Sequence, residues 1–128
     1  LIEIVQTIFD CVGETAIIDE KKMDAVTALS GSGPAYLFYF LEALEEAGVY
    51  MGLSARDARK AAEQTVYGSA LLAREREDAS ANELRAEVSS PGGTTVEAIK
   101  YFDENGMKGI IEEAVRRARD RSIELGEE

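Results

Sequence analysis

The sequence contains no histidine and no tryptophan, and its 128 residues include only two prolines and one cysteine, Cys11. A single cysteine excludes an internal disulfide framework, and the absence of histidine removes the usual zinc sites and histidine-based catalytic dyads. We therefore expect no metal site in this chain. Cys11 lies among the apolar residues Val5, Ile8, Phe9 and Val12, so we expect it in a packed interior.

Long apolar runs and basic residues are also scarce. No stretch of about 18 apolar residues occurs, and the N-terminus lacks the basic-then-apolar layout of a signal peptide, so a soluble, cytoplasmic protein is expected. The 25 acidic residues outnumber the 14 basic ones and give a formal charge of -11. Because this charge repels nucleic acid and anionic lipid, we expect neither nucleic acid nor a membrane as a partner.

The first 20 residues differ in pattern from the rest. Apolar residues recur at helical spacing up to Val12, Gly13 ends that pattern, and residues 15–18 form a short β-branched run typical of a strand. A lone strand has no partner to pair with, so residues 1–20 are predicted to be the tail of a domain whose other strands are absent. The chain starts at Leu1, within an apolar periodic segment, which indicates a piece of a longer protein.

Residues 21–128 are predicted to form a second, mainly helical domain. The pattern indicates a short helix over residues 23–29 and a break at residues 30–33. Pro34 then fits the first turn of a helix that runs to about Gly48, because a proline there costs no intrahelical hydrogen bond. The apolar beginning of that helix, residues 36–41, is expected to be deeply buried.

Capping signals mark the helices that follow. Three pairs have the spacing of a capping box, namely Ser54 with Asp57, Ser80 with Glu83, and Thr94 with Glu97. They open predicted helices that end near residues 77, 89 and 105, and a last apolar stripe follows Gly106. The helix after Ser54 turns small side chains toward its neighbours, which allows helices to approach closely.

The corner at residues 89–95 is the segment best suited to bind a ligand. Gly92 and Gly93 permit a tight turn, after which the N–H groups of Gly93, Thr94 and Thr95 can converge at the start of a helix. Unpaired N–H groups and the positive end of the helix dipole attract a carboxylate or a phosphate. One threonine hydroxyl could cap the helix while the other faces the ligand. The alternative is an ordinary helix-to-helix corner, since Pro-Gly-Gly is common in turns.

Residues 30–34 contain Gly-x-Gly but do not fit a dinucleotide fingerprint. That fingerprint follows a strand and has a third glycine or alanine, whereas here a helical segment comes first and Tyr36 occupies the third position. A tight turn between helices is therefore the better interpretation. Other candidate polar groups are Tyr36, Tyr39, Glu77, Asp78 and Glu83. None is assigned a catalytic role, because tyrosines in apolar helices usually pack and acidic residues usually face solvent.

Two motifs together give a family resemblance. SGSGPAY at residues 30–36 opens an apolar helix, and about 50 residues later VSSPGGTT and a following Ala-Ile occur within residues 88–99. With MGLS at residues 51–54, the pattern resembles pyrroline-5-carboxylate reductases over essentially the whole chain. In that family a dinucleotide-binding α/β domain precedes a helical dimerisation domain. The resemblance thus implies a mainly α fold, a helical bundle that dimerises through interlocking helices, after a short helix-strand remnant of the first domain.

The resemblance also implies an activity, the reduction of 1-pyrroline-5-carboxylate to L-proline by NADPH or NADH in the last step of proline biosynthesis. It implies that the backbone of Gly93 and Thr94 holds the substrate carboxylate, while Ser90 and Gly92 shape the turn. The Thr95 hydroxyl, as the catalytic group, would form a hydrogen bond with the ring nitrogen. Cofactor-binding residues would lie in the absent domain, so the isolated chain is expected to bind no cofactor and to be inactive.

The expected partner is a second copy of the chain, in a homodimer or a higher oligomer. Residues 36–44 and the small-residue face of the helix over residues 54–77 are the candidate contact surfaces. Two competing readings remain open. One is a non-enzymatic helical dimerisation or assembly domain whose glycine turns are only corners. The other is a different dehydrogenase with a similar helical domain and a larger acid as its substrate.

Overall fold

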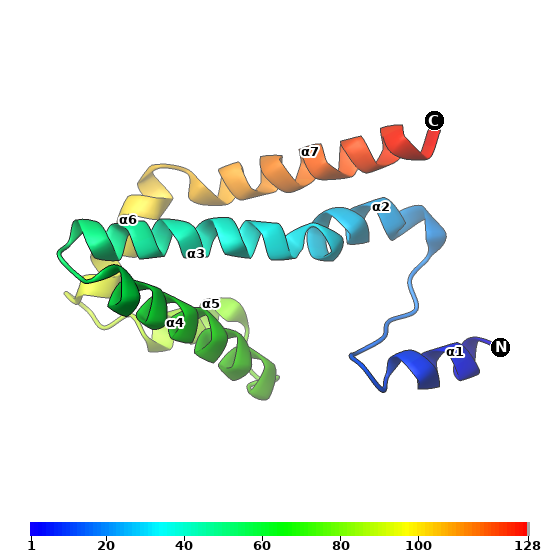
Figure 1. Ribbon diagram of the computed structural model, residues 1–128, viewed down its shortest axis with the longest axis horizontal. Helices are drawn as coiled ribbons and strands as arrows, with labels where there is room; N and C mark the ends of the chain where they lie inside the picture. Colours follow the sequence, from blue (N-terminus) through cyan, green and yellow to red (C-terminus); the bar gives the residue numbers. More distant parts are fainter. Residues whose placement is uncertain (128) are drawn as a thin grey trace.

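The computed structural model describes residues 1–127, and within these residues it is mainly α, as predicted, with no β-strand (Figure 1). Its α-helices are α1 (Ile2–Phe9), α2 (Met23–Val26), α3 (Gly33–Tyr50), α4 (Ala55–Glu75), α5 (Ala81–Glu87), α6 (Thr94–Glu104) and α7 (Met107–Glu127). Two short elements complete the list, a 3-10 turn η1 (Glu20–Lys22) and a π-helical turn η2 (Thr27–Gly31). The helices after residue 20 lie close to the predicted ranges.

Two helix contacts organise the body of the molecule. The most extensive contact among the described residues joins α3 and α4, and a second joins α7 to α2 and η2, so that α7 runs back past the start of α3 (Figure 1). The Ser122 hydroxyl donates a 2.7 Å hydrogen bond to Asp24 and ties α7 to α2. The result is an elongated arrangement of long helices, in which α5 and α6 form a corner at the end of α3 remote from η2.

Small side chains set the crossing of α3 and α4, as the sequence predicts. Ala58 and Ala62 of α4 are buried, and Gly48 of α3 is buried against them. A Cβ atom added to Gly48 would lie 2.9 Å from the Ala58 Cβ, closer than two carbon atoms can pack. Because only a glycine fits there, the two helix backbones approach closely.

The start of α3 shows a local departure from prediction. The helix expected over residues 23–29 ends as an α-helix at Val26 and continues as the π-turn η2, which closes with a 2.8 Å hydrogen bond from the Ser32 N–H to the Thr27 carbonyl. The Tyr36 hydroxyl donates to the carbonyl of the fully buried Ala28 at 2.9 Å. Pro34 lies in the first turn of α3 as expected.

Three expectations about burial and strands are wrong for the single chain. Residues 14–19 are extended but form no strand, because a strand requires a neighbour to exchange backbone hydrogen bonds and the described residues offer none. Cys11 is exposed, since no other helix covers α1 (Figure 1). The apolar start of α3 is also exposed: Phe38 and Tyr39 keep 68% and 77% of their surface accessible.

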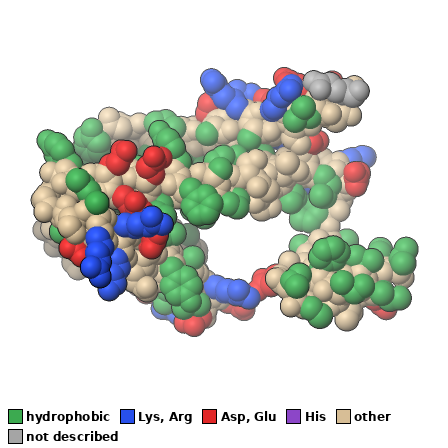
Figure 2. All heavy atoms as spheres, viewed as in Figure 1, with side chains coloured by type: hydrophobic (Ala, Val, Ile, Leu, Met, Phe, Trp, Pro, Cys, Tyr) green, Lys and Arg blue, Asp and Glu red, His purple; other side chains and the backbone are tan. Residues whose placement is uncertain are grey.

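The chain consequently exposes far more surface than a compact protein of its size. Its accessible area is 10684 Å², whereas a compact monomer of this mass exposes about 6,700 Å². The only buried apolar residues among those described are Ala28, Ala58 and Ala62. Apolar side chains are visible on α1 and along α3 in the space-filling view (Figure 2). A fold with so small an interior of its own needs a further surface to cover these side chains.

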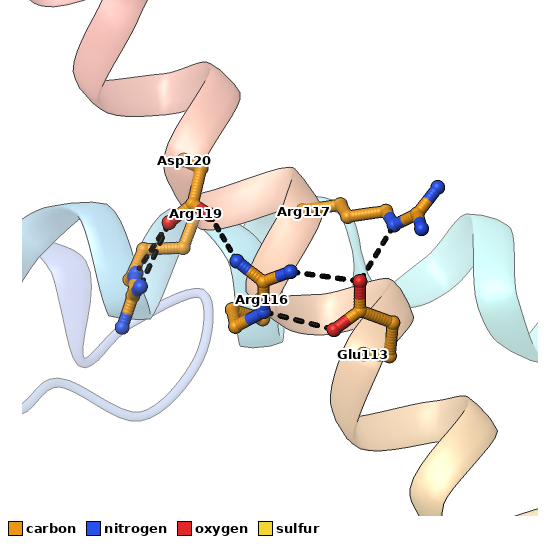
Figure 3. Close-up of polar contacts among 5 residues, drawn as sticks. All are labelled: Glu113, Arg116, Arg117, Arg119 and Asp120. Carbon is orange, nitrogen blue, oxygen red and sulfur yellow. Dashed lines mark hydrogen bonds and ion pairs between the residues drawn. The ribbon is translucent and has the colours of Figure 1, made fainter.

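An ion-pair network runs along α7 (Figure 3). Glu113 receives a bidentate pair of 2.8 Å hydrogen bonds from Arg116 and a third from Arg117. Arg116 also donates to Asp120 at 2.7 Å, and Asp120 accepts from Arg119. These hydrogen bonds, above all those from Arg116, lower the pKa of Glu113 to about 2. The pairs of Glu113 with Arg116 and Arg117, and of Arg116 with Asp120, are three or four residues apart and support the solvent-exposed side of the helix.

Candidate functional site

The candidate site is the corner between α5 and α6, and it contains a tight turn over residues 90–93. The Gly93 N–H donates a 2.9 Å hydrogen bond to the Ser90 carbonyl, and Gly92 has a φ of 68°. Proline at the second position and a left-handed glycine at the third are the features of a type II turn. The backbone preferences of Pro91 and Gly92 themselves therefore favour this turn, and the sequence alone is enough to predict it.

The turn uses one of the three amide groups predicted to converge on a ligand. Because the Gly93 N–H is bonded to Ser90, it is not available while the turn is closed. Gly93 has a different role: a Cβ atom added there would lie 3.0 Å from the Ser90 carbonyl oxygen. A side chain at this position would crowd the Ser90 carbonyl, so a glycine suits the close return of the chain.

The Thr94 and Thr95 N–H groups remain open at the start of α6. They belong to the first turn of the helix, where no earlier helical carbonyl exists, and no acceptor elsewhere in residues 1–127 bonds them. Thr94 is exposed and Thr95 is half-buried. Neither hydroxyl caps the helix, so both are available at the same mouth.

The capping box predicted for Thr94 and Glu97 is wrong. The N-cap residue of α6 is Gly93, which makes Thr94 the first helical residue and puts Glu97 at the fourth helical position instead of the third. From there the carboxylate cannot reach back to the N-cap N–H group. The other two capping predictions are confirmed. The Asp57 N–H donates to the Ser54 hydroxyl at 3.1 Å, and Ser80 and Glu83 form a complete capping box.

The approach to the turn is fixed by local hydrogen bonds. After α5, the Ser89 N–H donates to the Ala86 carbonyl at 3.1 Å, and the Ser89 hydroxyl donates to the Arg85 carbonyl at 2.6 Å. An open groove of about 540 Å³ lies between α5 and α6, lined on one side by Arg85 and Ser89 and on the other by Val96 and Lys100. It adjoins the turn without including residues 90–95, so the corner itself is a shallow, exposed feature in this chain.

The second glycine motif lies far from this corner. Residues 30–34 form η2 and the start of α3, and α3 separates them from the α5–α6 corner (Figure 1). Its 18 residues span about 27 Å. Within one chain, therefore, the two motifs singled out in the sequence do not form a common site.

Other kinds of site have no support among residues 1–127. No group of three or more Asp, Glu or Cys side chains is arranged to hold a metal ion. In the same residues, no helix combines the length and the apolar character needed to cross a bilayer.

The fold and the corner define a class: a mainly helical domain with a glycine turn at the start of a helix. A profile of one protein family, described as pyrroline-5-carboxylate reductase dimerisation, matches residues 20–125. This match covers most of the chain. The chain therefore belongs to the pyrroline-5-carboxylate reductase dimerisation family, which confirms the resemblance noted in the sequence.

Relatives and solved structures agree with this assignment. The pyrroline-5-carboxylate reductase of Aquifex aeolicus is 48% identical over 84% of this chain and 40% of its own length. That of Mycobacterium tuberculosis is 41% identical over 97% of this chain and 48% of its own length. The chain thus spans about half the length of these relatives or less.

Two solved structures show the same helical arrangement. The structure of a pyrroline-5-carboxylate reductase from Coxiella burnetii superposes with a TM-score of 0.91 at 40% identity, over 96% of this chain and 46% of that one. The Plasmodium falciparum pyrroline carboxylate reductase, described with NADP bound, gives a TM-score of 0.88 at 35% identity, over 97% of this chain and 50% of that one.

Proposed function

We propose that this chain is the substrate-binding and dimerisation half of a reductase that converts 1-pyrroline-5-carboxylate to L-proline with NADPH or NADH. The observation that carries the proposal is the corner itself: a closed Pro91–Gly92 turn leaves the N–H groups of Thr94 and Thr95 unpaired at the start of α6. The relatives that match the chain are named for this reduction, and the corner has groups that suit such a substrate.

The start of α6 is suited to the carboxylate of the substrate. Two unpaired N–H groups and the positive end of an 11-residue helix favour an anion at this point. In this proposal the Thr94 and Thr95 amides bind the carboxylate. Ser90, Gly92 and Gly93 contribute by holding the turn, with Gly93 acting through its bond to Ser90 and its lack of a side chain.

The Thr95 hydroxyl is the proposed catalytic group. Thr95 is the second residue of α6, is half-buried and forms no capping hydrogen bond. Its hydroxyl can therefore form a hydrogen bond with the ring nitrogen while the adjacent amides hold the carboxylate. Two contacts fix the ring of a small cyclic imine in the plane where its C=N carbon can be attacked. Such positioning carries much of the rate in a hydride transfer, so the absence of histidine is no obstacle.

The cofactor is proposed to be held by residues outside this chain. The chain offers no dinucleotide fingerprint, and the relatives it matches are about twice its length. A bound nicotinamide would supply the hydride. In this proposal residues 1–20 are the tail of the cofactor-binding domain, residues 21–128 are the dimerisation and substrate-binding domain, and the isolated chain has no reductase activity.

The proposed partner is a second copy of the chain. The chain exposes about 4,000 Å² more accessible surface than a compact monomer of this mass would show. Obligate dimers bury about 1,000–2,500 Å² on each partner, so this excess is large enough for such an interface. The exposed apolar side chains of α3, among them Leu37, Phe38 and Tyr39, offer a surface of the required kind. Light scattering at micromolar concentration should give a mass of at least twice the single chain, and a monomeric mass would contradict this part of the proposal.

The test of the proposed function is an NAD(P)H oxidation assay on the full-length protein that carries this chain. Thr95→Val removes the hydroxyl and nearly preserves the shape, and we expect a loss of kcat of about 10²-fold with the fold unchanged. Thr65→Val is the matched control, because Thr65 is exposed on α4 and its hydroxyl only bonds the Ala61 carbonyl. Equal activity of the two variants would contradict the role of Thr95.

The alternative function is a non-enzymatic helical dimerisation domain. It is favoured by the exposed apolar surface and needs no ligand at the corner. A titration with L-proline, followed at the Thr94 and Thr95 amides by NMR, separates the two readings. Selective shifts at these amides support the reductase, whereas their absence in the full-length protein saturated with cofactor supports the alternative.

A further inference from the structure

Arg76 joins the end of α4 to the far end of α5. Its guanidinium donates two parallel hydrogen bonds to the Glu87 carboxylate, at 3.2 and 3.4 Å, and a third to Asp78 at 3.2 Å. Arg76 and Glu87 are eleven residues apart in sequence. The planar fork of an arginine facing a carboxylate fixes direction as well as distance.

The helix that Arg76 contacts has few other tertiary contacts, although Leu84 and Arg85 of α5 are half-buried. Within residues 1–127, α5 makes no extensive packing contact with another helix, in contrast to α3 with α4. Its first turn is fixed by the capping box of Ser80 and Glu83. At its other end, Glu87 is the last helical residue, and the side chain that follows, Val88, is exposed. The bidentate pair to Arg76 is thus the main tertiary tie at the end of α5 that leads into the corner.

Local hydrogen bonds connect the C-terminal end of α5 to the candidate site. The Ser89 N–H and hydroxyl bond the carbonyls of Ala86 and Arg85, so Ser89 moves with the last turn of α5. The Gly93 N–H then bonds Ser90, and α6 begins at Thr94. A rotation at Glu87 would therefore be passed on to the Thr94 and Thr95 amides.

We propose that Arg76 is a positioning residue for the substrate corner, which acts by fixing the C-terminal end of α5 through Glu87. The proposal deepens the proposed function and rests on it. Arg76 does not contact the substrate in this account. An ordinary surface ion pair would behave differently. Arg59 and Glu63, for example, are one helical turn apart on α4, and their 2.8 Å pair lies within one helix. The attraction of Arg59 to Glu45 of α3 is Coulombic and is not a bidentate pair.

The experiment compares Arg76→Ala with Arg59→Ala in the full-length protein. If Arg76 positions the corner, its loss raises the KM for pyrroline-5-carboxylate about fivefold, the upper range for an exposed pair, and leaves the KM for NADPH unchanged. Arg59→Ala should change neither constant. Arg76→Lys keeps the positive charge but loses the planar guanidinium that bonds both carboxylate oxygens, so the substrate KM of this variant should lie between those of the wild type and Arg76→Ala. Equal substrate KM values for the alanine variants, or parallel rises for substrate and cofactor, would overturn the proposal.

A double variant tests whether the effect passes through Glu87. Glu87→Ala should reproduce the effect of Arg76→Ala, and the combination should be no worse than either change alone, because both remove the same tie. Additive losses would show that Arg76 acts by another route.

A second readout is independent of turnover. Hydrogen exchange of the Gly93 amide reports whether the turn stays closed, and we expect it to be faster in Arg76→Ala than in Arg59→Ala. If the wild-type protein reduces no pyrroline-5-carboxylate, the proposed function is wrong. The hydrogen exchange of the Gly93 amide in the two variants still tests whether Arg76 fixes the corner. Identical exchange in the two variants would refute that role.

Discussion

The α3–α4 crossing and the α5–α6 corner are held together by different forces. At the crossing, Gly48, Ala58 and Ala62 bring two helix backbones into contact, and no side-chain nitrogen or oxygen among the described residues is buried without a hydrogen bond. At the corner, a capping box, a glycine turn and an arginine–carboxylate pair fix the chain with almost no burial. The difference shows that packing sets the frame of this domain, whereas directional hydrogen bonds set the geometry of its candidate site.

The largest expected effect breaks the crossing. Gly48→Ala places a Cβ atom 2.9 Å from the Ala58 Cβ, so the helices must separate, and we expect a loss of about 1–3 kcal/mol in the free energy of unfolding. Gly109→Ala is the matched control, because nothing lies within 4 Å of its added Cβ and alanine favours a helix. Thermal unfolding at a fixed protein concentration measures both. A neutral Gly48→Ala would show that the crossing is loosely packed.

The next effect concerns the caps on either side of the corner. Ser80→Ala removes a complete capping box and should cost about 1 kcal/mol. Thr94→Ala removes a hydroxyl that caps nothing, so its cost should be close to zero. Urea titrations of the two variants decide the matter. Equal losses would mean that Thr94 caps α6 in solution, as its spacing to Glu97 suggested.

The smallest effect uses pH to separate the two regions. The Ser80 hydroxyl, and after it the Ser80 N–H, lower the pKa of Glu83 below its ordinary value of 4.5, and the Arg76 side chain lowers the pKa of Asp78 below 3.8. A lowered carboxyl pKa stabilises the folded state above the unfolded value, and this contribution disappears as pH falls through the folded value. Acidification below 4.5 should therefore loosen the entry to α5, where Asp78 and Glu83 lie, before it loosens the α3–α4 crossing.

NMR spectra of the Ser80 and Gly48 amides across this pH range provide the measurement, because Gly48 lies in the crossing and has no carboxylate next to it in the sequence. We expect the Ser80 signal to shift while the Gly48 signal stays in place. Glu83→Gln cannot titrate and serves as the control, so its Ser80 signal should stay constant over the same range. Simultaneous shifts at both amides would mean that acid unfolds the domain as a whole.

Much of the fold was predictable because its signals are local. The capping pairs at Ser54 and Ser80, the proline in the first turn of α3 and the stop at Gly106 all act within a few residues, and each was confirmed. The small residues of α4 predicted a close helix contact, which Ala58 and Ala62 make. The remaining errors concern features that depend on a partner or on a single-residue offset.

Two failures illustrate this limit. Residues 15–18 have strand-forming side chains, but a strand exists only when another strand accepts its hydrogen bonds, and Cys11 has apolar neighbours that no other helix covers. At the corner, the pattern of Thr94 and Glu97 fits a capping box whose first residue is in fact already helical. Residue spacing alone cannot show whether the helix begins at Thr94 or one residue later, because the same residues are compatible with both starting points.

The sequence by itself determined the helices, the turn at Pro91–Gly92 and the family, since these follow from local backbone preferences and from motifs of specific residues. The tertiary structure decided which side chains are covered: Gly48 of α3 packs against Ala58 of α4, whereas Phe38 and Tyr39 of α3 stay exposed in the single chain. It alone also revealed the tie from Arg76 to Glu87, because contacts between side chains eleven residues apart depend on how two helices are oriented in space.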